Sequence, residues 1–547
     1  MEADQEPPGA VGAVNIKKAP PPETSESIWT RRLVILSFWT VVLLFGLPVW
    51  YKTTTVYRAA LPLQAMNDWA DGKICRPVFP LRIAIDAPSL PHQDAQHLLR
   101  TTQHALDDLN EFSAHHLRLL LSEPSTPSNA SQKMTMDLDS SNSVSKGHLH
   151  DEDIALTVRM LPGSYTPTLD VYYTPNQIPS SSSTSSPLAT FVAYELQRVF
   201  AEEQAQLAHL LSSSATSQTG QVKSLSKDDA VRLARQTTRS FKYAPTYHLT
   251  FSLFTPVAVP SAWEIRSALE EYISPLLESL SPISNFTVDT QVQLYAKFSH
   301  SFHEPEYDTS LKAWTLQKEE LSAFVNAAEW PLSPSIGVGP TINFVLYVPA
   351  ENQSPLVVKE TGGSSWLIPQ WGGVQILNSG TLKSTLSRED LQPAMLTFSH
   401  QLMSLLGVPH APVSLPMRLS TLTRVRAASL LFSASSTLGS LARLTQALQS
   451  IAIPDTVAQA VDTTIEHLYR ACNELREGRF ATALESARIA EAEAEKAFFE
   501  RSMVGQVYFP DEHKVAVYLP LLGPIAVPLV MTAIKELKST YKRWRAA

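Results

Sequence analysis

The chain has 547 residues, 44% of them hydrophobic, and its 52 acidic residues outnumber its 44 basic ones, giving a net charge of −8. This balance argues against a nucleic-acid-binding protein, which needs a basic face, and 39 prolines with only 19 glycines exclude collagen-like compositions. Two cysteines, Cys75 and Cys472, are too few for a disulfide framework or a cysteine-based zinc site. Whether they are bonded to each other is left open, since the sequence gives no distance between them.

The N-terminal region predicts a polar tail followed by a membrane span. Residues 1–28 are rich in Pro, Glu and Ala, which is typical of a disordered tail. The run from Leu33 to Trp50 carries no charge, and at about 1.5 Å per residue it is long enough to cross a bilayer. We therefore expect a transmembrane helix at 29–51. A cleaved signal peptide is disfavoured, because the apolar run is too long and a polar segment precedes it.

A second uncharged run at 515–534 predicts a second transmembrane helix. Pro520, Pro524 and Pro528 recur every four residues, so they share one helical face, and neighbouring membrane helices can satisfy the carbonyls that they free. We expect this face to pack against other transmembrane helices; a simple kinked anchor is the alternative. The basic tail at 535–547 indicates that both termini are cytoplasmic, which makes residues 52–514 lumenal.

Three N-glycosylation sequons agree with a lumenal location for this region. They are Asn129-Ala-Ser, Asn285-Phe-Thr and Asn352-Gln-Ser. Asn285 is the best placed, because it follows a turn-like segment and precedes a clear strand pattern. The third sequon runs into Ser354-Pro355, which we expect to hinder its modification.

Residues 52–386 predict a lumenal α/β domain, a mixed sheet with flanking helices. Alternating or continuously apolar patterns predict strands, and apolar residues at three- and four-residue spacing predict helices. Ser261 and Glu264 have the spacing of a capping box before one of these helices. The expected strands are 80–86, 168–174, 246–254, 288–298 and 342–348, and the expected helices are 90–112, 191–211 and 265–280. Serine-rich stretches at 122–147 and 178–188 predict solvated loops.

Residues 387–514 predict a lumenal helical region. Within it, 455–503 predicts a helical hairpin that turns at Gly478. Cys472 lies on the apolar stripe of the first helix, which favours a packed core position over a reactive thiol. One stripe of the second helix consists of alanines, which permit close approach: Ala483, Ala487, Ala490, Ala494 and Ala497.

Motifs for chemistry are scarce. The sequence lacks a nucleophile elbow, a phosphate-binding loop, a dinucleotide fingerprint and a zinc-protease motif. Metal-like residues gather beside a serine-rich loop, where nothing rigid holds them, so we interpret them as a solvated loop: His148, His150, Asp151 and Asp153. Ser399, His400 and His410 suggest a nucleophile and base, although adjacent side chains on a helix diverge. Trp366, Trp371 and Gly372-Gly373 predict a tight turn with aromatic packing, or a partner surface.

Several segments, in their order along the chain, resemble the PIG-S family of subunits of the glycosylphosphatidylinositol (GPI) transamidase. PVWYKTTTVYRAALP follows the first span, and SNFTVDTQVQLY surrounds Asn285. WLIPQWGGVQILN, STLGSLARLTQALQSIAIPDTVAQAV and EKAFFERSMVGQVYFPDEHKVAVYLPLLGPIAVPLV continue the resemblance into the second span. It therefore covers the chain from the first span to the last.

The resemblance implies a non-catalytic scaffold subunit in the endoplasmic reticulum membrane, with no cofactor or metal of its own. The complex replaces a C-terminal signal of a precursor protein with a GPI lipid, and the family's nucleophilic Cys and His lie in a caspase-like subunit. Implied partners are that subunit, further transamidase subunits and membrane lipid, with the GPI lipid and the precursor protein as additional candidates. The family also implies N-glycans, and Asn285 falls within a matching segment. The competing hypothesis is a membrane-anchored lumenal hydrolase that uses His400 or His410.

Overall fold

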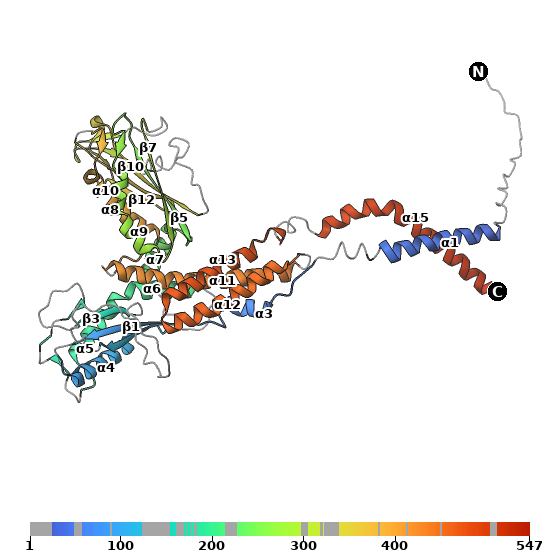
Figure 1. The fold of residues 1–547 in the computed structure, drawn as a ribbon, viewed down its shortest axis with the longest axis horizontal. Coiled ribbons are helices and arrows are strands. Elements are labelled where there is room, and N and C mark those ends of the chain that lie inside the picture. Colours follow the sequence, from blue (N-terminus) through green and yellow to red (C-terminus); the bar gives the residue numbers. More distant parts are fainter. Residues whose placement is uncertain are drawn as a thin grey trace, which may run out of the picture. The chain divides into compact units, whose positions relative to one another are not determined.

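The computed structural model divides into two compact units (Figure 1). The larger unit comprises residues 61–446 and 456–498, and the smaller one comprises residues 1–60, 447–455 and 499–547. Within them the structure describes residues 24–46, 48, 57–87, 90–122, 154–159, 169–171, 173–174, 177–179, 183–213, 227–296, 305–317, 321, 339–380, 383–411, 414–448, 451–503 and 511–546.

A parallel four-stranded sheet begins the larger unit, with its strands in the order β2-β1-β3-β4. Helix α4 connects β1 to β2, as parallel neighbours require, and its apolar stripe buries Leu98 and Leu106. Helix α5 packs beside α4. The bounds are Phe79–Asp86 for β1, His115–Leu121 for β2, Ile154–Arg159 for β3, Leu169–Asp170 for β4, His92–Leu109 for α4 and Pro187–Val199 for α5.

The predicted strand at 80–86 and helix at 90–112 are confirmed as β1 and α4. The single helix predicted at 191–211 is wrong: α5 ends at Val199, Phe200 has non-helical dihedral angles, and α6 (Ala201–Ser213) follows. Of the strand predicted at 168–174, only Leu169–Asp170 pairs with β3 among the described residues.

A second, mixed sheet has the strand order β12-β13-β10-β5-β7, with only β12 antiparallel to its neighbour. The central strand β10 (Thr341–Tyr347) is buried from Ile342 onward, as its continuous apolar run predicts. Strand β7 forms one edge and ends earlier than expected, because the chain turns through Tyr295 at a φ of 57°. The remaining bounds are Thr246–Phe254 for β5, Asn285–Gln293 for β7, Ser365–Ile368 for β12 and Gly372–Ile376 for β13.

The tryptophan-rich segment is structural, since it forms the β12–β13 hairpin. Trp366 and Trp371 pack against a core cluster that includes Val374 and Ile376. A Cβ on Gly372 would lie 1.8 Å from the carbonyl oxygen of Asn343, and one on Gly373 would meet the side chain of Gln401 at 1.9 Å. The glycine pair is therefore required by the close approach of strand β10 on one side and helix α10 on the other.

Helix α10 (Arg388–Leu405) covers one face of the second sheet. Its Phe398 ring lies 5.1 Å from Phe344, which in turn lies 5.1 Å from Phe251. The capping box predicted at Ser261 and Glu264 is wrong, because helix α8 begins only at Ile265 and Ser261 donates its N–H to Ser384. The capping box that does form joins Ser387 and Asp390 at the start of α10. Smaller elements complete this part: β6 Ala262–Trp263, β8 Glu306–Asp308, β9 Ala313–Leu316, β11 Leu356–Val358, β14 Thr385–Leu386, α7 Lys227–Arg239, α8 Ile265–Tyr272 and α9 Ser274–Leu280.

The predicted helical region, 387–514, begins with α10, which packs on the second sheet. Three longer helices follow it: α11 (Leu415–Ala447), α12 (Asp455–Glu477) and α13 (Phe480–Phe498). The hairpin prediction is confirmed, because α12 and α13 are joined at Gly478, whose φ of +81° favours glycine. All five alanines of the predicted stripe are buried.

The short helix α3 (Leu63–Ala70) packs against this helical region, and a disulfide bond links the segment after α3 to it. Cys75 forms a disulfide with Cys472 of α12, with their Cα atoms 6.2 Å apart. The Trp69 ring meets the edge of Tyr469 with centroids 5.0 Å apart. A bridge that the sequence left open is thus formed, and Cys472 is buried as its apolar stripe predicts.

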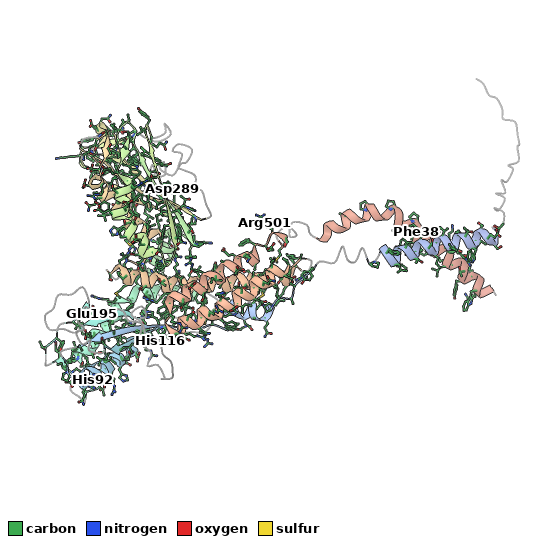
Figure 2. All side chains as sticks on the ribbon, in the orientation of Figure 1. Phe38, His92, His116, Glu195, Asp289 and Arg501 are labelled. Atoms are coloured by element: carbon green, nitrogen blue, oxygen red, sulfur yellow. A yellow bond between two sulfur atoms is a disulfide. The ribbon has the colours of Figure 1, made fainter. Side chains whose placement is uncertain are left out.

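The smaller unit contains α1 (Ser25–Val41), which continues as a π-helical turn over Val42–Gly46, and the long helix α15 (Asp511–Ala546). By length and composition, residues Ser25–Gly46 form the one helix in the described part of the chain that could cross a membrane. Most of its large apolar side chains are exposed, Phe38 among them (Figure 2). Near the start of α1, Arg31 and Arg32 pair with Glu536 of α15 at 3.3 and 2.8 Å.

Candidate functional site

Two of the three predicted glycosylation sites lie on the surface. Asn285 is exposed at the start of the edge strand β7, and Asn352 is exposed in a short 3-10 helix, Glu351–Gln353. The hydroxyl of Thr287, which completes the first sequon, contacts Nδ1 of His248 on β5. Asn129 lies outside the described residues.

The three prolines predicted for helix packing lie inside α15, and the helix runs on through all of them. Pro520, Pro524 and Pro528 are each exposed. Their shared face is therefore available for contact with another helix.

The residues considered for nucleophilic chemistry do not assemble into a catalytic group. Ser399 is buried and donates its hydroxyl to the carbonyl of Met395 one turn earlier, whereas His400 is exposed. His410 contributes only its backbone N–H, which Glu202 accepts at 3.1 Å. No group of three or more metal-ligating side chains occurs among the described residues, and the cluster from His148 to Asp153 lies outside them.

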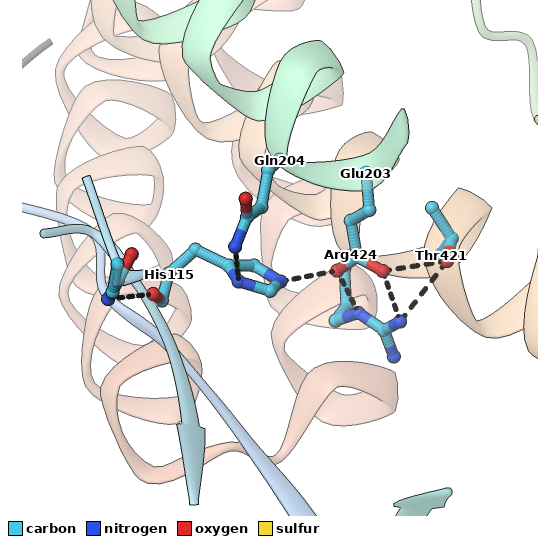
Figure 3. Close-up of polar contacts among 6 residues, drawn as sticks. His115, Glu203, Gln204, Thr421 and Arg424 are labelled. Atoms are coloured by element: carbon cyan, nitrogen blue, oxygen red, sulfur yellow. Dashed lines mark hydrogen bonds and ion pairs between the residues drawn. The ribbon is translucent and has the colours of Figure 1, made fainter. Parts of the chain in front are cut away.

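A polar group that does assemble in the described part of the chain is a buried ion pair, Glu203 with Arg424 (Figure 3). The Arg424 guanidinium donates from Nε and Nη2 to the two carboxylate oxygens, each at 2.6 Å. Thr421 donates its hydroxyl to Oε2 at 2.7 Å, and Nε2 of His115 lies 3.5 Å from Oε1. We call these four residues the Glu203 cluster.

The Glu203 cluster joins parts of the larger unit that are far apart in sequence. His115 begins β2 of the first sheet, Glu203 comes from α6, and Arg424 and Thr421 come from α11. The guanidinium of Arg424 also lies 5.4 Å from the centre of the Phe480 ring, at the start of α13. Through these polar contacts, the cluster links the first sheet to the helical region.

The electrostatics keep Glu203 ionised. Burial alone would raise the pKa of its carboxyl, because the charged form loses hydration. The charge of Arg424 and its two hydrogen bonds outweigh this, so the pKa of Glu203 lies well below its usual range. A bidentate pair with a third donor supplies the compensation that a buried carboxylate requires.

The Glu203 cluster has no room for a substrate. His115, Glu203 and Arg424 are 0%, 2% and 3% exposed. The hollow beside His115 measures about 10 Å³, space for roughly one water molecule. The cluster therefore has the residue types of a catalytic acid–base group, but its role is to stabilise the packing of the fold.

Sequence reasoning missed this cluster, although a signal was present. Glu203, Leu207 and Leu211 share one stripe of helix α6 and are all buried, so the carboxylate occupies a core position of the pattern. A charged residue on an apolar stripe indicates a buried partner. The identity of that partner, 221 residues further along the chain, carries no such signal.

Comparison with known proteins shows the family to which the chain belongs. The sequence profile of the family described as "Phosphatidylinositol-glycan biosynthesis class S protein", PIG-S, matches residues 37–543. The chain is 27% identical to the GPI-anchor transamidase component PIGS of Homo sapiens, over 93% of this chain and 95% of that protein. It is 28% identical to the GPI transamidase component PIG-S homolog of Schizosaccharomyces pombe (93% and 84%) and to the GPI transamidase component GPI17 of Saccharomyces cerevisiae (91% and 90%). With most of its length matched, the chain belongs to the PIG-S family.

Proposed function

We propose that this chain is a non-catalytic scaffold subunit of GPI transamidase, which supports the attachment of GPI anchors to precursor proteins at the endoplasmic reticulum membrane. The observation that carries the proposal is the family match over residues 37–543, with relatives named as components of that transamidase. The bond-forming chemistry then belongs to another, caspase-like subunit. The competing hydrolase hypothesis is not supported, since neither His400 nor His410 has a serine partner among the described residues.

The proposal includes two membrane spans, with both termini in the cytoplasm and the larger unit in the lumen. Helix α1 and the apolar part of α15, residues 515–534, would be the spans. The ion pairs of Arg31 and Arg32 with Glu536 support this, because they hold the beginning of α1 beside the far end of α15. The two helices then run in opposite directions, and the chain ends lie on one side. The Cys75–Cys472 disulfide also favours an oxidising lumen.

Glycosylation tests the lumenal placement. In a eukaryotic host we expect the chain to shift on a gel after enzymatic glycan removal, and the variant Asn285→Gln to lose one full glycan step. The reason is that Asn285 is exposed and stands at the start of an edge strand. Thr287→Ala should lose the same step, and the matched control Thr287→Ser should keep it. A chain with no glycan at any sequon would place the larger unit in the cytoplasm.

Co-purification tests the scaffold role and the proline face together. The tagged chain, solubilised in mild detergent, should bring down a caspase-like subunit and further transmembrane subunits. Replacing Pro520, Pro524 and Pro528 with Leu should keep membrane insertion but reduce recovery of partners several-fold, because leucine removes the shape of the packing face.

The control for the proline variant is Val530→Leu with Ile534→Leu, two exposed positions of α15 outside the proline row. It should recover partners like the natural chain. Unchanged recovery by the proline variant would show that this face is a simple kinked anchor. Recovery of the natural chain without any partner would overturn the scaffold proposal itself.

A further inference from the structure

Helix α15 does not end with the apolar run but continues to Ala546. Beyond residue 534 it carries three large side chains, Leu537, Tyr541 and Trp544, at spacings of four and three, which places them on one stripe. They are 72%, 60% and 79% exposed. An exposed stripe of this kind on a helix indicates a binding surface.

Basic side chains form a second stripe on the same segment. Lys535, Lys538, Lys542 and Arg545 follow one another at spacings of three, four and three, and all four are exposed. Residues 535–546 thus present an aromatic stripe next to a cationic one, and we call this segment the basic–aromatic extension.

The single acidic residue of the basic–aromatic extension does not offset this charge. Glu536 lies on a different side of the helix and is engaged by Arg31 and Arg32 of α1. The pairing brings two further arginines to the same end of the helix pair. The surface at this end is therefore strongly cationic.

We propose that the basic–aromatic extension binds anionic phospholipid headgroups of the leaflet in which the second span ends. The inference rests on the proposed function, which places residue 534 at the cytoplasmic surface. Tyr and Trp prefer the headgroup level of a bilayer, and Lys and Arg beside a span attract acidic lipids. An apolar stripe and a basic stripe together supply the two signals that stable surface binding needs. Charge complementarity selects acidic lipid over a second apolar helix as the occupant.

The full-length chain is reconstituted into nanodiscs that contain equal amounts of phosphatidylinositol and phosphatidylcholine. The lipids retained by the purified protein are then counted by mass spectrometry. We expect phosphatidylinositol to be enriched several-fold, and the enrichment to fall as salt is raised. Replacing Lys535, Lys538, Lys542 and Arg545 with Gln should remove it, and Tyr541→Ser with Trp544→Ser should weaken it.

A matched control is Arg235→Gln with Arg239→Gln, which removes exposed charge from α7 of the larger unit and should leave the enrichment unchanged. Equal retention of both lipids by the natural chain, or enrichment that survives the four Gln substitutions, would overturn the inference. Alkaline extraction and protease access to a C-terminal epitope on sealed microsomes separate this from failure of the proposed function. A protected epitope would overturn both, whereas an accessible epitope without lipid enrichment would overturn the lipid inference alone.

Discussion

Loss of the Cys75–Cys472 disulfide is expected to destabilise the larger unit more than any other single change in it. The bond joins positions 397 residues apart, so cross-linking removes a large part of the freedom of the unfolded chain. For a loop of this length the chain-entropy estimate is about 6 kcal/mol. Melting of the purified chain, with and without reductant, should show a decrease of roughly 5 °C or more on reduction.

The effect should be specific to this bond. The variant Cys75→Ala with Cys472→Ala should melt at the temperature of the reduced natural chain and should no longer respond to reductant. The neighbouring contacts, Trp69 against Tyr469 and the Arg476 side chain on the carbonyl of Arg76 at 3.3 Å, remain in that variant. Two titratable thiols in the unreduced natural chain, with no response to reductant, would contradict the prediction.

The Cys75–Cys472 bond also fixes the position of the chain segment that precedes the first sheet. Residues 61–78 lead from the first predicted span into strand β1, and α3 is their one described helix. The disulfide, the Trp69–Tyr469 contact and the close approach of Gly439 to Ala70 hold this segment on α11 and α12. The segment before the first sheet is therefore held on the helical region within the larger unit.

Sequence patterns over short stretches predicted the helices, strands and turns that are determined by interactions between residues close in sequence. Strands β5 and β10 and the α12–α13 hairpin follow from apolar periodicity, and the turn at Gly478 follows from the backbone freedom of glycine. The errors also have local causes. Phe200 interrupts an otherwise continuous helical pattern, and the spacing of Ser261 and Glu264 imitates a capping box in a segment that pairs with β14.

Long-range pairings could not be predicted in the same way. Strand β5 pairs with β7 and also with β10, almost a hundred residues away, and no local pattern encodes that neighbour. The Cys75–Cys472 bridge and the Glu203–Arg424 pair are of the same kind. In each case the sequence pattern indicates that one of the two residues or strands is buried. It does not indicate which distant residue or strand is its partner, because that depends on the tertiary fold. The family resemblance identified the assembly to which the chain belongs, but it did not predict these long-range contacts either.

Removing the charge of Glu203 is the second large perturbation. Glu203→Gln keeps the shape of the side chain but leaves the Arg424 guanidinium buried without a counter-ion, which costs about 3–5 kcal/mol. The control Glu270→Gln, at an exposed position of α8, should cost about 1 kcal/mol or less. Denaturant unfolding of the three proteins at neutral pH measures the difference. Equal stability of Glu203→Gln and the natural chain would show that the pair contributes nothing to the fold.

The same pair predicts a direction for the pH dependence. The pKa of Glu203 lies below its ordinary value of 4.5 in the folded chain, so the folded state holds its proton less tightly than the unfolded state does. The stability that the charge contributes is therefore complete above about pH 5 and is lost as the pH falls toward the folded pKa. The gap between the natural chain and Glu203→Gln should accordingly be constant from pH 6 to 8 and narrow below about pH 4. A gap that widened on acidification would mean that the folded chain holds the carboxyl protonated, which the two 2.6 Å bonds from Arg424 oppose.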